Sequence, residues 1–233
     1  MEDVPLHTQI LEDLGSKIVH GVYPEGTVFR AEDLVEKYGA SRTVVLHAVR
    51  GLELMGLLST RRRVGLTVKP ESKWMVYDPR IVKWRLSGPH QIEQLMNFVE
   101  LRTCYEPFAA RLCAERSSRE VGFKLRNLAQ ELSNAAFAGE KPDYSSINRI
   151  DADYHCTILD GTDNYMIAAL AGTTRAVIEG RMQYTTLPER ANENTVRAHM
   201  ELAQAILDRD ADTAERVMTQ IINAIPDELK IGM

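Results

Sequence analysis

Apolar side chains recur at helical spacing in the N-terminal part of the chain. The pattern predicts helices over 7–20 and 31–38, and a third that begins after Ser41, whose hydroxyl can cap it. Gly39 stands where a glycine commonly ends a helix, so the last two helices are joined by a tight turn, as in a helix-turn-helix. The three buried stripes are Ile10, Leu11, Leu14 and Ile18; then Leu34, Val35 and Tyr38; then Val45, Ala48, Val49, Leu52 and Met55.

Two short strands are predicted beyond Gly56, over 57–60 and 66–69. The residues between them, RRRVG, would form the arginine tip of a two-stranded wing. The chain carries a net charge of -5, yet residues 37–69 hold seven basic residues and one acidic residue, a local charge of +6. This segment is either a solvated basic surface or a face for a polyanion such as a DNA duplex.

The rest of the chain has a helical period throughout. Residues 70–77 read as a connection and 78–86 as a short helix that carries Trp84. Longer helices are predicted over 91–116, 118–138, 143–159, 164–186, 190–209 and 211–230. No alternating strand pattern, GxGxxG, P-loop or GxSxG occurs there, which argues against nucleotide-binding and serine-hydrolase folds. We therefore expect a mostly α protein: a winged helix-turn-helix domain over 1–70, a linker with a short helix over 71–90, and an all-α helical bundle over 91–233.

The composition and the N-terminal residues indicate where in the cell the protein is expected. The chain has 233 residues, 44% of them hydrophobic, and its longest uncharged stretch is the 11 residues 164–174, too short for a bilayer span. Acidic residues occupy the N-terminus where a signal peptide would be basic and then apolar, so we expect a cytoplasmic protein. The three cysteines include no CxxC pair, which is typical of reduced thiols.

Three residues of the helical region form a candidate metal site. Asp151 and His155 are four apart on one predicted helix, so both leave the same face, and His199 follows on another helix. One carboxylate and two imidazoles suit a divalent transition metal, with zinc as the first choice, and leave positions open for a ligand. The alternative is a helix-surface ion pair between Asp151 and His155, with His199 an ordinary half-buried histidine.

Arg102 and Thr195 are candidate effector-binding residues. Arg102 lies among apolar residues, so its guanidinium needs an anion. That anion is either Glu106, four residues on, or the carboxylate of an effector. Thr195 lies one turn before His199 and can donate to a ligand hydroxyl.

Residues 21–68 resemble the winged helix-turn-helix of the GntR superfamily of bacterial transcription regulators. The family begins its recognition helix with Ser-Arg and then Thr-Pro-Val-Arg-Glu-Ala-Leu, where this chain has SRTVVLHAV over 41–49. Leu46 stands where the family usually has a base-reading arginine, and His47 replaces its glutamate. Leu46 is either a contact for a thymine methyl group or an inert surface leucine. The resemblance and the charge together suggest a set of DNA-contacting residues: Arg42, Thr43, Leu46, His47, Arg50, Arg61, Arg62, Arg63 and Gly65.

Residues 91–228 are similar to FCD, the all-helical ligand-binding domain of the FadR subfamily of these regulators. The marks are VELRTCYEPFAARLCAER, DADYH and TVRAHMELAQAILDRDADTAERVMTQI. Metal-binding members generally use an aspartate and three histidines, which Asp151, His155 and His199 match. The fourth ligand falls at Ile221, so this chain lacks it. A three-ligand variant resembles the regulators of hexonate catabolism, and the resemblance favours the effector-binding role of Arg102.

These observations lead to one expected function and two alternatives. We expect a homodimeric, metabolite-responsive repressor, not an enzyme, that leaves its double-stranded DNA operator when a small carboxylate such as gluconate binds. A metal-dependent enzyme with an Asp/His/His site is one alternative. An acyl-CoA-responsive regulator is the other, although an acyl chain needs an apolar tunnel and no metal ligands.

Overall fold

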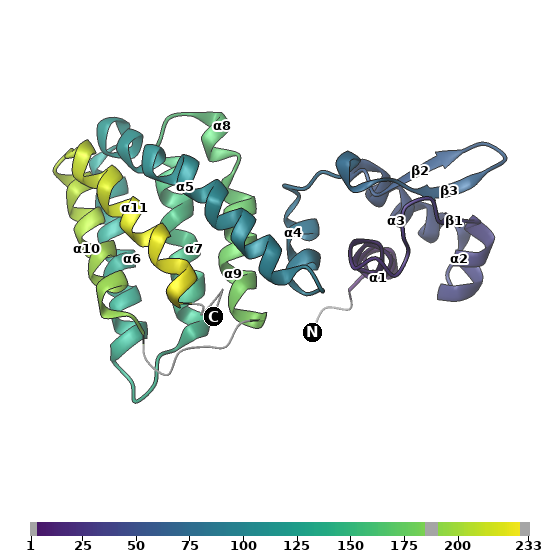
Figure 1. Ribbon diagram of the computed structural model, residues 1–233, viewed down its shortest axis with the longest axis horizontal. Coiled ribbons are helices and arrows are strands. Elements are labelled where there is room, and N and C mark those ends of the chain that lie inside the picture. Colours follow the sequence, from purple (N-terminus) through teal and green to yellow (C-terminus); the bar gives the residue numbers. More distant parts are fainter. Residues whose placement is uncertain (1–3, 185–190, 229–233) are drawn as a thin grey trace. The chain divides into compact units, whose positions relative to one another are not determined.

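A computed structural model describes residues 4–184 and 191–228 of the chain (Figure 1). The chain divides after His90 into two compact units, residues 1–90 and 91–233. Each unit has its own hydrophobic cluster. The mostly helical architecture predicted from the sequence is confirmed.

The first unit contains a helix-turn-helix and a small sheet. Its elements begin with α1 (Leu6–Val19), β1 (Val28–Phe29), α2 (Ala31–Tyr38), α3 (Arg42–Leu54), β2 (Leu58–Arg61) and β3 (Gly65–Val68). The predicted helices and the two-stranded wing are therefore present. The antiparallel sheet also has a third strand, β1, with the order β1-β3-β2 and Val28 opposite Thr67. A two-residue strand has no alternation that a sequence pattern could show.

A short helix completes this unit. After a single 3-10 turn, η1 (Glu71–Lys73), the chain forms α4 (Pro79–Leu86), and Ile81 and Trp84 join the hydrophobic cluster of α1 and α3. A Cβ on Gly15 of α1 would lie 2.3 Å from the Trp84 ring, so only glycine allows this approach. The Trp84 indole donates to Glu12 Oε2 at 2.7 Å. The helix expected between the domains thus packs as part of the winged unit.

The second unit is a bundle of helices (Figure 1). They are α5 (Gln91–Arg116), α6 (Arg119–Phe137), α7 (Tyr144–Asp160), α8 (Tyr165–Ala168), α9 (Ala171–Tyr184), α10 (Glu193–Leu207) and α11 (Ala211–Glu228). The single helix predicted over 164–186 is wrong, because the chain breaks between α8 and α9. There Leu170 N donates to Ile167 O, three residues back, and this tighter turn ends α8. Residues 185, 186, 190, 229 and 230 of the predicted helices lie outside the described residues.

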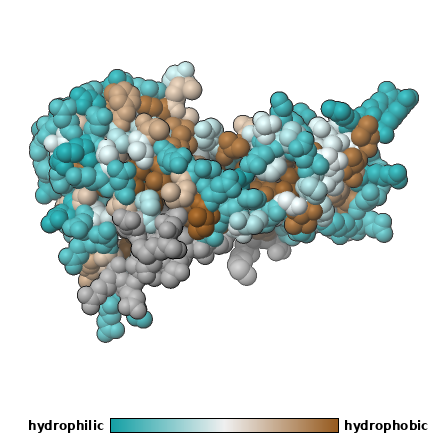
Figure 2. Space-filling model, in the orientation of Figure 1, coloured by the Kyte–Doolittle hydropathy of each residue, from teal (hydrophilic) through white to brown (hydrophobic). Residues whose placement is uncertain are grey.

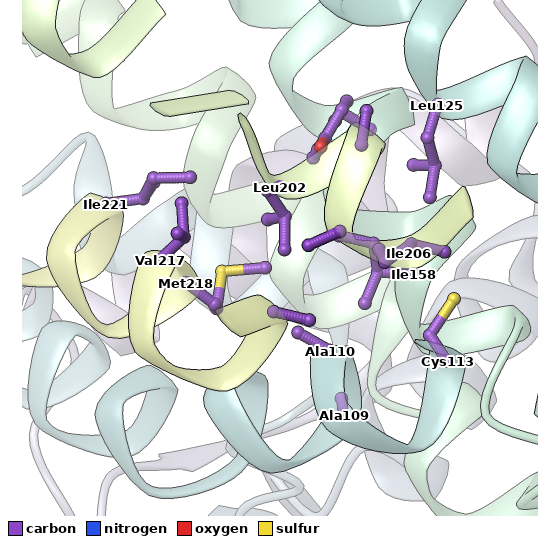
Figure 3. Close-up of a cluster of buried hydrophobic side chains, with 14 of the residues drawn as sticks. Ala109, Ala110, Cys113, Leu125, Ile158, Leu202, Ile206, Val217, Met218 and Ile221 are labelled. Carbon is purple, nitrogen blue, oxygen red and sulfur yellow. The ribbon is translucent and has the colours of Figure 1, made fainter. Parts of the chain in front are cut away.

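Small and branched apolar side chains fill the core of the bundle. Figure 3 shows Ala110 of α5 beside Met218 of α11 and Leu202 of α10, and Ala109 and Cys113 of α5 belong to the same cluster. The alanines let α5 and α11 approach closely, which holds the long α5 against the bundle. This packing fixes the helices α5, α7 and α10, which carry the candidate site. None of the described helices is long and apolar enough to cross a membrane.

Candidate functional site

Helix α3 has one buried and one exposed face. Ser41 caps it, because its hydroxyl accepts from Val44 N at 3.4 Å. Its buried side is formed by Val45, Ala48, Val49 and Leu52. All five residues proposed on this helix as DNA contacts are exposed: Arg42, Thr43, Leu46, His47 and Arg50.

Both arginines of this face have acidic neighbours. Arg42 forms an ion pair with Glu32 of α2, and Arg50 lies 3.5 Å from Glu53. Glu53 also accepts from Thr60 N at 2.8 Å, so it ties α3 to the wing strand β2. These arginine side chains remain well exposed, at 61% and 70%. Exposed pairs of this kind contribute little stability, so both guanidiniums can exchange an acidic partner for a phosphate.

The wing tip is basic and sharply turned. Arg61, Arg62 and Arg63 are exposed, and Val64 N donates to Arg61 O at 3.1 Å to close the turn. Arg63 adopts a left-handed φ of 66°. Gly65 has φ 117°, and a Cβ there would lie 2.6 Å from Phe29 O of β1, so the sheet itself requires this glycine. Figure 2 shows hydrophilic surface over the end of the β2–β3 hairpin.

The three predicted metal ligands lie together inside the second unit. Asp151, His155 and His199 are 5%, 1% and 1% exposed, and one ligand atom of each lies within 4.8 Å of the others. Asp151 Oδ1 is 3.1 Å from His199 Nε2 and 3.4 Å from His155 Nε2. The pair on α7 is therefore buried and is not the surface ion pair of the alternative interpretation.

The outer nitrogen of each imidazole lies close to an oxygen atom. His199 Nδ1 lies 2.8 Å from Thr195 O, and His155 Nδ1 lies 2.6 Å from Glu106 Oε2. The Thr195 carbonyl can only accept, so His199 Nδ1 carries a proton. The Nε2 atom of each imidazole faces Asp151 Oδ1, and on loss of its proton it would offer a lone pair to a metal ion. Metal-binding histidines are held in this way.

Two of the three donor-atom separations match those found around a metal ion. Ligands with bonds of about 2.1 Å lie about 3.0–3.4 Å apart at octahedral or tetrahedral angles. The two distances from Asp151 Oδ1, 3.1 Å and 3.4 Å, agree with this range. The donor set of two imidazole nitrogens and one carboxylate oxygen therefore fits a divalent transition metal.

Arg102 lies beside this cluster on α5 and is 1% exposed. Its Nε and Nη2 donate to Glu106 at 2.5 Å and 3.1 Å, so the internal pair considered from the sequence is present. Burial would raise the pKa of Glu106, but Arg102 and then His155 hold that pKa at about 2. Burial likewise opposes protonation of His155, yet Glu106 raises its pKa above the ordinary value. The result is a buried chain of charge, Arg102–Glu106–His155–Asp151.

Two further predicted positions can now be placed. Thr195 is half-buried on α10, one turn before His199. Ile221, at the position of the absent fourth ligand, is 4% exposed and belongs to the hydrophobic cluster with Val217 and Met218 (Figure 3). The fourth ligand position of the family is therefore apolar in this chain.

Sequence reasoning missed three contributors to this region. It paired Glu106 with Arg102 alone, whereas Glu106 also holds His155. Tyr154 donates its hydroxyl to His199 O at 2.8 Å and so fixes the backbone of a ligand. Asn148, one turn before Asp151 on α7, is 8% exposed, and its spacing from Asp151 was the one available signal.

Comparison with known proteins gives matches over both units. Residues 6–68 match the family described as bacterial regulatory proteins, gntR family, and residues 97–224 match the FCD domain. Two similar proteins come from Escherichia coli strain K12. The galactonate operon transcriptional repressor is 26% identical, covering 95% of this chain and 96% of its own length. The Uxu operon transcriptional regulator is 25% identical, covering 84% and 76%.

A similar fold occurs in a solved structure. The E. coli protein McbR/YncC aligns with a TM-score of 0.54 at 17% identity, covering 98% of both chains. At that identity the likeness concerns the fold alone. It agrees with the helical bundle and the winged unit described above.

Proposed function

Since the chain belongs to the gntR family of bacterial regulatory proteins and carries an FCD domain, we propose that it represses genes of sugar-acid catabolism and that a sugar acid such as gluconate releases it from its operator. Regulation of transcription through DNA is the activity of this family. Family membership therefore excludes the metal-dependent enzyme considered for the same three ligands. Because the proposed target is chromosomal DNA, we propose that the protein acts in the cytoplasm.

The winged unit supplies the proposed DNA contacts. The exposed face of α3 enters a major groove, and the arginine tip of the wing approaches the neighbouring backbone and minor groove. The contacts assigned here are Arg42, Thr43, Leu46, His47 and Arg50 on α3 and Arg61, Arg62, Arg63 and Gly65 on the wing. One such unit reads only a half-site, so we propose that the protein acts as a homodimer on an operator with two-fold symmetry.

The buried cluster is the proposed metal centre. Asp151, His155 and His199 would hold a divalent ion, and zinc is the first choice because its preferred ligands are imidazole nitrogen, carboxylate oxygen and thiolate. The ion would supply a positive centre to which the carboxylate and a hydroxyl oxygen of a sugar acid bind as a chelate. Glu106 and the Thr195 carbonyl orient the two imidazoles toward it.

One observation carries the proposed effector class: a buried cluster of charged and polar side chains whose possible ligand atoms lie close together. Such a site fits a small chelating anion and does not fit the hydrocarbon chain of an acyl-CoA. Arg102 and Thr195 are the residues that we propose for the effector carboxylate and a hydroxyl. The galactonate and Uxu operon regulators among the similar proteins support this class.

Isothermal titration tests the proposal. Gluconate is titrated into zinc-loaded protein and into protein stripped with a chelator, and affinity should be lost on stripping. Asp151→Asn should lose zinc and gluconate binding together, since each ligand strengthens the other by the same factor. Asp153→Asn is the matched control, because Asp153 is a partly exposed residue of the same helix that pairs with Arg175.

Release from DNA needs a second measurement. The purified protein selects its operator from random duplex DNA, and gluconate is added to the complex in a gel-shift assay. We expect release with zinc and retention after stripping. Equal gluconate affinity with and without zinc would contradict a metal-assisted site, and no effect on the DNA complex would contradict an effector role.

A further inference from the structure

Asn148 has a buried side-chain oxygen without a hydrogen-bond partner among the described residues. The residue is 8% exposed, and the atom without a partner is Oδ1. Buried polar atoms in native proteins nearly always have partners, and an orphaned acceptor lowers stability. The usual explanation is a ligand or a water molecule that completes the pair.

The helix places this side chain on the side of the metal ligands. Asn148, Asp151 and His155 are three and four residues apart on α7, and successive steps of 100° bring all three within about 60° of one another. All three are buried. Asn148 lies about 4.5 Å along the helix axis from Asp151. It therefore borders the cluster without belonging to it.

The chemistry of the orphaned atom limits its partner. Oδ1 of an amide accepts a hydrogen bond, so the partner must donate one, and an effector carboxylate cannot. A hydroxyl can. Asn148 is about one helical turn from Asp151. It is therefore too far away to contact the oxygens that chelate an ion at Asp151, but it can contact a hydroxyl further along a sugar-acid chain.

We propose that Asn148 accepts a hydrogen bond from a hydroxyl of the sugar-acid chain beyond its chelating end, and so selects polyhydroxy acids over short hydroxy acids. The inference rests on the proposed function, because it takes the effector to be a hydroxy acid at the Asp151 cluster. A site built to bond a hydroxyl discriminates against ligands that lack it, since the buried acceptor is then left unpaired.

The test compares two acids and three variants by isothermal titration into zinc-loaded protein. Gluconate carries a chain of hydroxyls, whereas glycolate has only the carboxylate and the adjacent hydroxyl. Asn148→Leu and Asn148→Ala should weaken gluconate about tenfold and leave glycolate unchanged. Asn134→Ala is the matched control, because Asn134 is exposed on α6 of the same unit. Melting temperatures are measured without ligand.

Each outcome has a defined meaning. Asn148→Leu should melt at or above the wild-type temperature, because an apolar side chain of similar volume replaces an orphaned acceptor. A much lower melting temperature would show that Asn148 has a structural partner and overturn the inference. Unchanged gluconate affinity in Asn148→Ala and Asn148→Leu would show that the amide oxygen binds an internal water and not the effector. Equal weakening of both acids would show that Asn148 does not select between them. Either result overturns this inference and leaves the proposed function standing. Failure of the wild type to bind either acid would refute the proposed effector class itself.

Discussion

Replacing Glu106 by glutamine separates two roles of Arg102: a member of an internal ion pair and a ligand for an effector. The carboxylate of Glu106 lies between Arg102 on its own helix and His155 on α7. Glutamine keeps the size of the side chain and removes its charge. Arg102 is then left buried without a counter-charge, so we expect a large loss of stability.

The expected size follows from the contacts. Burial raises the pKa of Glu106, yet Arg102 and His155 bring it from the ordinary 4.5 to about 2. At 1.36 kcal/mol for each pKa unit, this corresponds to about 3 kcal/mol in favour of the charged form. Removing one partner of a buried pair costs roughly 3–5 kcal/mol. The melting temperature of the second unit should therefore fall by roughly 6–20 °C.

Two optical signals make the measurement specific. Both tryptophans of the chain, Trp74 and Trp84, lie in the first unit, so their fluorescence follows that unit. Helical circular dichroism follows mainly the second unit. Glu106→Gln should shift the circular-dichroism transition and leave the fluorescence transition in place. Glu215→Gln is the control, because Glu215 forms a partly exposed pair with Arg111 and should lose at most about 1 kcal/mol.

A double variant completes the test. Arg102→Met combined with Glu106→Met removes both charges, and apolar replacements of a buried pair are often neutral or stabilising. Most of the lost stability should therefore return. A loss below about 1 kcal/mol in Glu106→Gln, the size of a surface pair, would refute the reasoning, because the buried guanidinium would then need no internal counter-charge.

Three further outcomes are expected. Arg42→Ala should abolish operator binding in gel shifts with little change in melting temperature, whereas the exposed Arg126→Ala should change neither; unchanged affinity in Arg42→Ala would remove α3 as the recognition helix. Leu46→Ala should weaken binding to thymine-containing operator but not to the same operator with uracil in place of thymine, if Leu46 contacts a thymine methyl group; equal weakening on both duplexes would exclude that contact. A fragment of residues 1–90 should fold, while 1–70 should not, because it lacks the buried Ile81 and Trp84; cooperative unfolding of 1–70 would contradict this.

The sequence was a good guide wherever a pattern repeats. Helix α3 could be predicted because Val45, Ala48, Val49 and Leu52 mark one face and Ser41 caps it. Strand β1 could not, because two residues carry no period and its position is set by pairing with β3. The break between α8 and α9 is similarly local, since one tightened turn at Leu170 ends a helix without a proline.

The candidate site likewise has residues that the sequence could predict and contacts that it could not. Asp151 and His155 share a helix, so their spacing alone places them together, whereas His199 was a candidate by residue type that the family resemblance then supported. The contact between Glu106 and His155 joins two helices and depends on how α5 packs against α7. No local pattern contains that information. The orphaned amide of Asn148 depends on the whole surrounding packing and could be seen only in three dimensions.

The attachment of α4 to α1 has a mechanical consequence. Trp84 is held twice, by its indole on Glu12 and by its carbonyl, which lies 2.7 Å from His20 Nε2. A displacement of the chain at residue 91 would therefore act first on α4 and on α1, to which α4 is bound, and not on the β2–β3 hairpin. Helix α1 in turn packs along α3. The covalent link to the second unit is therefore coupled to α3 through packed side chains and two hydrogen bonds of Trp84.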